Sequence, residues 1–155
     1  MELIREKSHK NLGRLLLQSG SISQKQLQEV LDHLKRSGNR IAQTLVELGH
    51  ISEKQLVNTI STTLNIPNLS LAGLEINPAV VNLIPYELAK SCGSIPILLF
   101  GNVLIVATDD PCDGGAVNRI ARHTKKEIKT AVATISDIQS LLRKYHNNNR
   151  QSMSC

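Results

Sequence analysis

Apolar residues in the first 66 positions recur at intervals of three and four, which is the spacing of amphipathic helices. The run Leu27, Val30, Leu31 and Leu34 is the clearest example. Shorter apolar segments, "LGRLLLQS" and "IAQTLVEL", precede two such runs, and a glycine follows each of them. The pattern therefore predicts four helices arranged as two helical hairpins.

Two segments of this region have nearly the same sequence. "GSISQKQL" begins at Gly20 and "GHISEKQL" begins at Gly49. Each glycine suits the left-handed position just past a helix end, where a side chain would be strained. A serine then caps the next helix, and a glutamine three residues later completes a capping box. These residues are Ser23 with Gln26, and Ser52 with Gln55. Helix termination and capping thus explain the repeated letters without any ligand.

The second half has a different pattern. "IPILLF" and "VLIVAT" are apolar runs typical of strands, and Gly101 and Asn102 between them predict a β-hairpin. "EIKTAVAT" predicts a third strand. Short helices are predicted at "NPAVVNLIP", capped by Asn77, and after Pro85. "DGGAVNRIARHTKK" predicts a longer helix, and "SDIQSLLRKYH" predicts a last helix capped by Ser136.

These elements predict an α+β fold, in which a tandem helical-hairpin repeat of four helices packs beside a small β-β-α-β-α unit. We expect the repeat to occupy residues 1–66 and the α/β unit residues 67–146. The segment "NIPNLSLAGLEI" is the predicted connector. Residues 147–155, "NNNRQSMSC", are predicted to form a disordered tail.

The composition is that of a folded globular chain, with 155 residues of which 41% are apolar and 20% charged. No apolar run reaches the roughly 18 residues of a membrane span, and the start lacks the apolar core of a secretory signal. A cytoplasmic location without direct membrane insertion is therefore expected. The three cysteines form no CxxC pair and predict reduced thiols rather than disulfides or a thiolate metal site.

The formal net charge of +5 arises from basic residues in both halves rather than from one block. Single-stranded nucleic acid is usually bound by aromatic rings among positive charges, and this chain has only two tyrosines and one phenylalanine. In a helix-turn-helix interpretation, the recognition helix "SEKQLVNTISTTL" would carry only Lys54 as a basic residue, beside Glu53. Neither DNA nor RNA is an expected partner.

No catalytic or metal-binding residue is predicted. The phosphate-binding motif G-x-x-x-x-G-K-[ST] is missing from the sequence, so ATP hydrolysis is not expected. The five histidines never have the spacing of a helical zinc site. Asp109, Asp110 and Asp113 do not reproduce a calcium loop and predict a polar turn, with Asp113 capping the next helix. A cysteine–histidine nucleophilic pair stays open, because neighbours in space are not visible in a sequence.

The longer copies of the repeat, "NLGRLLLQSGSISQKQLQEVLDHL" and "RIAQTLVELGHISEKQLVNTISTT", resemble the pattern RLGxxLxxxGxIxxxxLxxALxxQ. That tandem pattern belongs to the MshEN domain, the N-terminal domain of hexameric ATPases of type II secretion and type IV pilus assembly. "NLIPYELAKSCGSIPILLFGNVLIVATDDPCD" and "ISDIQSLLRKYH" also resemble that domain, so the resemblance covers nearly residues 10–146. It implies a non-enzymatic domain, isolated or stand-alone, without the ATPase motor.

In this family, some domains bind cyclic di-GMP across the two motifs, whereas others dock onto membrane-associated secretion components. Arginines of such a site can contact guanine edges or phosphates. The second copy retains Arg40, whereas Asn11 replaces the arginine of the first copy, where Arg14 is a candidate substitute. The ligand-binding set that the resemblance implies is Asn11, Leu12, Gly13, Arg14, Gly20, Leu27, Leu31, Arg40, Ile41, Gly49, Leu56 and Ile60.

The motif positions that are retained are mostly those that capping and packing explain. Three of the four polar positions expected to contact the ligand are changed. The leading hypothesis is therefore a regulatory or adaptor domain that docks onto a protein component of a secretion, type IV pilus or motility system. Such a partner would bring it to the inner membrane face. The alternative is a cyclic di-GMP receptor that uses the tandem motif, and neither function requires a cofactor.

Overall fold

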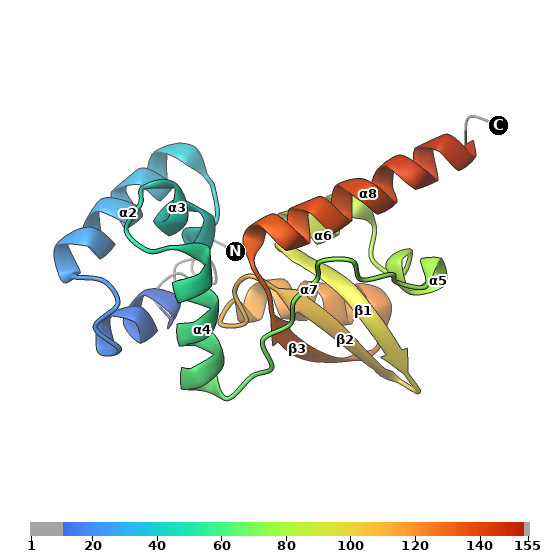
Figure 1. Ribbon diagram of the computed structural model, residues 1–155, viewed down its shortest axis with the longest axis horizontal. Helices are drawn as coiled ribbons and strands as arrows, with labels where there is room; N and C mark the ends of the chain where they lie inside the picture. The colour runs from blue at the N-terminus through green and yellow to red at the C-terminus, as the bar shows by residue number, and fades with distance from the viewer. Residues whose placement is uncertain (1–10, 154–155) are drawn as a thin grey trace.

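The computed structural model describes residues 11–153 (Figure 1). The first ten residues of the predicted repeat and the last two of the predicted tail lie outside that range. Residues 11–18 form the first helix of the described residues. The other elements are α2 (Gln24–Ser37), α3 (Ile41–Glu47), α4 (Glu53–Leu64), α5 (Pro78–Val81), α6 (Tyr86–Ser91), β1 (Ser94–Phe100), β2 (Val103–Thr108), α7 (Gly114–Thr124), β3 (Glu127–Val132) and α8 (Ile135–Met153).

The helices of the first half form the two hairpins that the repeat predicts, residues 11–18 with α2 and α3 with α4. Gly20 and Gly49 have φ values of 74° and 77°, so both have the expected left-handed conformation. Both capping boxes are present. The side chains of Ser23 and Ser52 each accept the N–H of the glutamine three residues later, and that glutamine side chain accepts the serine N–H. The capping predictions are confirmed.

The second half contains a three-stranded sheet with the order β1-β2-β3. β1 and β2 form the predicted antiparallel hairpin across Gly101 and Asn102. α7 carries the chain back, so that β3 runs parallel to β2. A shift in register between Pro96 and Leu98 marks a bulge in β1. Figure 1 shows the helical repeat on one side of the sheet and the β1–β2 loop at the opposite end.

Two clusters of buried apolar side chains stabilise the fold. One lies in the helical repeat, and the other lies between the sheet and the helices of the second half. The first cluster also contains Val132 at the end of β3 and Ile135 at the start of α8. The connector after α4 pairs with the same strand, because Val132 N donates to Pro67 O at 2.8 Å and Leu69 N donates to Val132 O at 2.9 Å. The two predicted units therefore pack directly on each other, and their division after residue 66 stays a prediction.

The start of the last helix differs from the prediction. α8 begins at Ile135, and Thr134 Oγ1 accepts the N–H of Asp137 at 3.3 Å, so Thr134 caps the helix. Ser136, the predicted cap, instead donates its N–H and its hydroxyl to Glu53 Oε1, each at 2.8 Å. The prediction was wrong because it weighed only sequence neighbours, whereas Glu53 lies 83 residues away.

The end of α8 also differs from the prediction. The helix continues to Met153, into the segment for which the sequence predicts a disordered tail. Extending an existing helix requires no new nucleation, so polar residues can continue it even without a packed face. Although α8 has 19 residues, it lacks the apolar length needed to cross a membrane, as does every other helix between residues 11 and 153.

Candidate functional site

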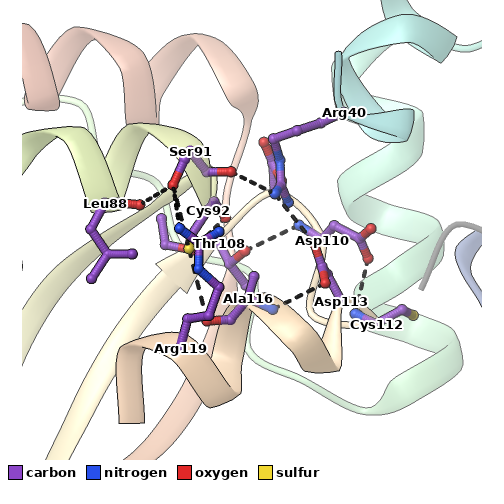
Figure 2. A network of polar contacts seen from close by, with 12 residues as sticks. Arg40, Leu88, Ser91, Cys92, Thr108, Asp110, Cys112, Asp113, Ala116 and Arg119 are labelled. Carbon is purple, nitrogen blue, oxygen red and sulfur yellow. Dashed lines mark hydrogen bonds and ion pairs between the residues drawn. The ribbon is translucent and has the colours of Figure 1, made fainter. Parts of the chain in front are cut away.

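A cluster of polar side chains lies where the helical repeat meets the end of the sheet (Figure 2). Arg40 precedes α3 and reaches toward the loop after β2. Its Nη2 lies 2.8 Å from Asp109 Oδ1, and its Nη1 lies 3.4 Å from Asp113 Oδ2. Nη1 also donates to the backbone carbonyl of Ser91 at 3.2 Å. We call Arg40, Asp109, Asp110 and Asp113 the Arg40 cluster.

Local hydrogen bonds hold the carboxylates of this cluster in place. Asp113 caps α7, because its Oδ1 accepts the N–H of Ala116 at 3.1 Å. Its other oxygen is left to face Arg40. Asp110 Oδ1 accepts the N–H of Cys112 at 2.9 Å. Hydrogen bonds within the loop between β2 and α7 therefore orient Asp110 and Asp113 independently of Arg40, whereas the Asp109 carboxylate is bonded to Arg40.

Gly93 provides the space in which this ion pair sits. Its carbonyl accepts the N–H of Asp109 at 3.1 Å, and its φ is +57°. A Cβ atom at this position would collide with the Asp109 carboxylate and would lie 2.7 Å from Arg40 Nε. Both the backbone conformation and the close approach therefore require glycine.

Burial dominates the electrostatics of the Arg40 cluster. Asp109 and Asp110 are only 4% and 2% exposed. Burial raises the pKa of Asp110 from its ordinary value of 3.8 to about 7; Arg40 opposes this rise, and the two neighbouring aspartates add to it. Burial also raises the pKa of Asp109, again against the effect of Arg40. For Arg40, burial acts to lower the pKa, but the carboxylates hold it above its usual range. The guanidinium is thus a permanent cation, and Asp110 exchanges its proton near neutral pH.

The thiols near the cluster are poor nucleophiles. Burial raises the pKa of Cys92. Burial, followed by the charges of Asp110 and Asp113, raises the pKa of Cys112 to about 12. Since the thiolate is the reactive form, neither thiol is activated at neutral pH. Cys155 lies outside the described residues. Between residues 11 and 153, no group of three or more histidine, cysteine or carboxylate side chains could hold a metal ion.

A comparison with protein families identifies the kind of domain that carries this cluster. The model of the MshEN domain matches residues 64–152, which is more than half of the 155 residues. The chain belongs to the MshEN domain family. The resemblance that the tandem motif indicated is therefore confirmed, and the matched range includes the three acidic residues of the Arg40 cluster.

Two curated relatives of this MshEN domain are much longer proteins. Type IV pilus assembly ATPase PilB of Myxococcus xanthus is 31% identical over 135 residues, which are 87% of this chain and 24% of the relative. Type IV pilus assembly ATPase PilB of Thermus thermophilus is 31% identical over 139 residues, which are 88% of this chain and 16% of the relative. The chain thus spans less than a quarter of the length of either ATPase.

Solved structures share the fold. A structure of MshE with cdg has a TM-score of 0.64 and 28% sequence identity, and the match covers 86% of this chain and 97% of that one. The N-terminal domain of XpsE has a TM-score of 0.68 and 19% identity over 88% of this chain and 94% of that one. At this lower identity the XpsE likeness shows the fold alone. Together they confirm the α+β fold class.

The predicted ligand-binding residues of this MshEN domain lie in different environments. Arg40 is directed at the α/β unit and bonded there. Asn11 and Arg14 are exposed on the first helix. The apolar members belong to the core of the helical repeat, buried within it or packed against it half-buried: Leu12, Leu27, Leu31, Ile41, Leu56 and Ile60. The structure therefore brings the apolar members together as a core, and it directs the retained arginine elsewhere.

The glycines of the motif have structural roles as well. A Cβ at Gly13 would lie 2.8 Å from a methyl group of Leu27, so the absence of a side chain lets the two helices approach. Gly20 and Gly49 have open space around them and serve the helix ends. A small depression of about 230 Å³ on the repeat involves none of the predicted residues. Its lining is Ser21, Ile51, Gln55, Asn58 and Thr59.

Sequence reasoning found Arg40 but missed its partners. The polar turn after β2 is present, and Asp113 caps α7 as predicted. The burial of Asp109 and Asp110 was not foreseen. One signal for it was available, because two adjacent carboxylates directly follow the apolar run "VLIVAT". Carboxylates at the end of a buried strand need a cation or several hydrogen bonds, which points to an arginine elsewhere in the chain.

Proposed function

We propose that this MshEN domain is a non-enzymatic regulatory domain that docks onto a protein component of a type IV pilus, type II secretion or motility machine. The observation that carries the proposal is the bonding of Arg40. Its guanidinium is engaged by Asp109 and Asp113 across the junction of the two units. Because the guanidinium is already paired with carboxylates of the same chain, it is not free to bind a nucleotide. This pairing supports a domain that docks onto a protein.

The remaining polar positions of the tandem motif support the same proposal. Asn11 replaces the first arginine, and Leu34 and Thr63 replace the two final glutamines. Recognition of a guanine edge or a phosphate depends on charged or hydrogen-bonding groups. Asn11 lacks the positive charge of an arginine, Leu34 has no hydrogen-bonding group, and Thr63 offers a hydroxyl in place of an amide. What the repeat retains is its packing and its capping, which give a stable surface for a partner.

No catalytic step is assigned to this domain. Cys92 and Cys112 have raised pKa values, so they do not supply a thiolate at neutral pH. The two PilB relatives are ATPases, but this chain matches only 24% and 16% of their lengths. We propose that ATP hydrolysis in such proteins belongs to the portion that this chain does not match.

Calorimetric titration with cyclic di-GMP tests the proposal. It is run on the unmodified chain and on Arg40→Ala, with GTP as the control for unspecific nucleotide binding. A docking domain gives no saturable heat with cyclic di-GMP at micromolar concentrations. Binding of about −8 kcal/mol or better, which corresponds to a micromolar Kd, would contradict the proposal if Arg40→Ala abolished it.

Docking itself is measured with individual partners. The cytoplasmic parts of pilus and secretion proteins from the same organism are purified and titrated one at a time against the chain. We expect saturable binding to one of them, at a surface of the helical repeat or of its junction with the sheet. If none of them binds, the docking proposal is lost, whatever the result with cyclic di-GMP.

A second candidate function is a cyclic di-GMP receptor. The structure of MshE with cdg, that is, cyclic di-GMP, favours it, with a TM-score of 0.64 and 28% identity. In this candidate, Arg40 exchanges the Asp109 carboxylate for a phosphate or guanine of the ligand, and Arg14 replaces the cation missing at Asn11. The other predicted motif residues would line the site around these groups.

Asp109→Asn separates the two candidates. The substitution removes the charge that competes for Arg40 and keeps the size of the side chain. A receptor would then bind cyclic di-GMP about tenfold more tightly, since roughly 1.4 kcal/mol of competing interaction is a factor of ten. A docking domain would still not bind. Asp32→Asn, at an exposed position of α2, is the matched control and should leave either result unchanged.

A further inference from the structure

The β1–β2 turn lies at the end of the sheet away from the helical repeat (Figure 1). Large apolar side chains beside this turn are exposed. Phe100 is 78% exposed and Leu98 is 51% exposed, and they are the two most exposed large apolar side chains of residues 11–148. Both belong to the last residues of β1, before the turn. Phenylalanine and leucine are among the residues most often found inside proteins, so their joint exposure on one strand needs an explanation.

The strand register places these side chains beside two further apolar residues. Phe100 lies opposite Val103, and Leu98 lies opposite Ile105. Residues that face each other across neighbouring strands project from the same face of a sheet. Val103 and Ile105 are only half-buried. We call Leu98, Phe100, Val103 and Ile105 the hairpin patch.

Basic side chains lie beside the hairpin patch. The N–H of Glu127 donates to the carbonyl of Asn102 at 3.0 Å, so the start of β3 lies next to the β1–β2 loop. Lys125 and Lys126 immediately precede this contact. Lys129 follows on β3, and it is aligned in register with a hairpin-patch residue of β2. The lysines therefore lie along the β3 side of the hairpin patch, where Glu127 is aligned in register with Val103.

The charge of this corner is strongly positive. Arg122 lies in the last turn of α7, which ends directly before the lysines. The segment "RHTKKEIK", residues 122–129, contains four arginine or lysine residues and a single carboxylate, Glu127, so its formal charge is +3 with histidine neutral. Apolar and basic side chains thus share one corner of the molecule, without a compensating acidic surface in that segment.

We propose that this corner binds the surface of an anionic phospholipid membrane. The side chains of Phe100 and Leu98 enter the headgroup layer, while Lys125, Lys126 and Lys129 lie at the lipid phosphates. Charge complementarity selects an anionic surface. Phe100 directly precedes the two-residue turn at the end of the sheet, and Leu98 lies two residues before it. At this end of the molecule, both side chains can insert into the headgroup layer of a membrane. The contact is peripheral and does not require a membrane-spanning segment. It is independent of the proposed docking function.

Sedimentation with vesicles tests the electrostatic part. The full chain is mixed with vesicles of phosphatidylcholine alone, or of phosphatidylcholine and phosphatidylglycerol in equal parts. Binding is expected only to the mixed vesicles and should fall with added salt. Lys126→Glu with Lys129→Glu should weaken it at least about tenfold, because each basic residue near an anionic surface contributes about 1 kcal/mol. Lys25→Glu with Lys54→Glu, which changes exposed lysines of the helical repeat by the same charge, is the matched control.

Fluorescence tests the apolar part. The chain contains no tryptophan, so Phe100→Trp introduces a single reporter. Its emission should shift to shorter wavelength with the mixed vesicles and stay unchanged with phosphatidylcholine alone. In the sedimentation assay, Phe100→Ser should weaken binding several-fold. Leu64→Ser, at another partly exposed leucine, should not.

Three results would overturn the proposal. The first is the absence of sedimentation with phosphatidylglycerol vesicles, which would make an acidic protein surface the partner to test for the same corner. The second is an equal loss of binding in the two pairs of lysine variants, since net charge alone would then explain the attraction. The third is an unshifted emission of Phe100→Trp while the protein is bound, because the hairpin patch would then not touch the lipid.

Discussion

Arg40 Nη2 and Asp109 Oδ1 lie 2.8 Å apart, although the two residues are separated by 69 positions in the chain. Arg40 belongs to the helical repeat and Asp109 to the loop after β2. Their side chains are 18% and 5% exposed, so the pair is largely removed from water. Removing one partner of such a pair leaves an uncompensated buried charge, which is the unfavourable state. The junction of the two units therefore depends on both residues.

Asp109→Ala should lower the free energy of unfolding by about 3 kcal/mol, because Arg40 would stay buried with weaker compensation. Urea denaturation measures the change. The double variant Arg40→Ala/Asp109→Ala should lose less than the sum of the single variants, since it leaves neither charge of the pair alone. The exposed Arg14→Ala is the control and should change stability by no more than about 0.5 kcal/mol. A loss below about 1 kcal/mol in Asp109→Ala would contradict the interpretation of a buried link.

Gly93→Ala should be more harmful than the same change at another glycine with positive φ. Gly20 and Gly93 both have left-handed backbone conformations, but only Gly93 has neighbours that a Cβ would strike. We expect Gly20→Ala to lose about 1 kcal/mol from the backbone alone. Gly93→Ala should lose about 3 kcal/mol, since the Arg40 pair must also shift. Thermal unfolding of both variants gives the comparison. Similar losses of stability would show that Asp109 and Arg40 can move away from the new Cβ atom at little cost in free energy.

Asp110 should make the folded state less stable as pH rises. Its pKa is about 7 in the folded protein and 3.8 ordinarily, so the folded state holds the proton more tightly. The stabilisation is fully present below about pH 4 and is lost as pH rises through about 7. The expected loss between pH 5 and pH 8 is about 2–3 kcal/mol, reduced by any rearrangement of the cluster. Asp110→Asn should flatten this dependence in denaturation experiments at several pH values. An unchanged slope would exclude Asp110 as its source.

Thr134→Ala and Ser136→Ala distinguish the observed cap of α8 from the predicted one. Thr134→Ala should lower the free energy of unfolding by about 1 kcal/mol, because the N–H of Asp137 loses its acceptor. Ser136→Ala should lose less, about 0.5 kcal/mol, since the exposed bond between its hydroxyl and Glu53 is lost while the backbone N–H bond remains. Urea denaturation of both variants decides the order, and the reverse order would restore Ser136 as the cap.

Local features of the fold were predictable from the sequence. The left-handed Gly20 and Gly49, the two capping boxes and the Gly101–Asn102 turn all depend on residues within a few positions of one another. Short-range hydrogen bonds and steric limits determine these features, so the local amino-acid sequence is sufficient to predict them. The family followed from the same short-range patterns, because their spacing is the tandem motif.

Contacts between distant residues were not predictable. Ser136 had the right spacing for a capping box, but Glu53 on α4 takes its donors. Arg40 was found as a motif arginine, but its acceptors in the loop after β2 were interpreted only as a polar turn. In both cases a side chain from the other unit decides the outcome. The sequence shows which polar groups need partners, but the packing of the two units determines which residues those partners are.

Synthesis of the chain separates the two ends of the Arg40–Asp109 pair in time. A ribosome adds roughly 5–20 residues per second, so Asp109 is made several seconds after Arg40. The helical repeat depends largely on contacts between nearby residues, which form quickly. Val132 and Ile135, which complete its core, are made later still. A nascent chain that ends before β2 therefore presents Arg40 to water, and only the arrival of the second half withdraws that guanidinium from other anions in the cell.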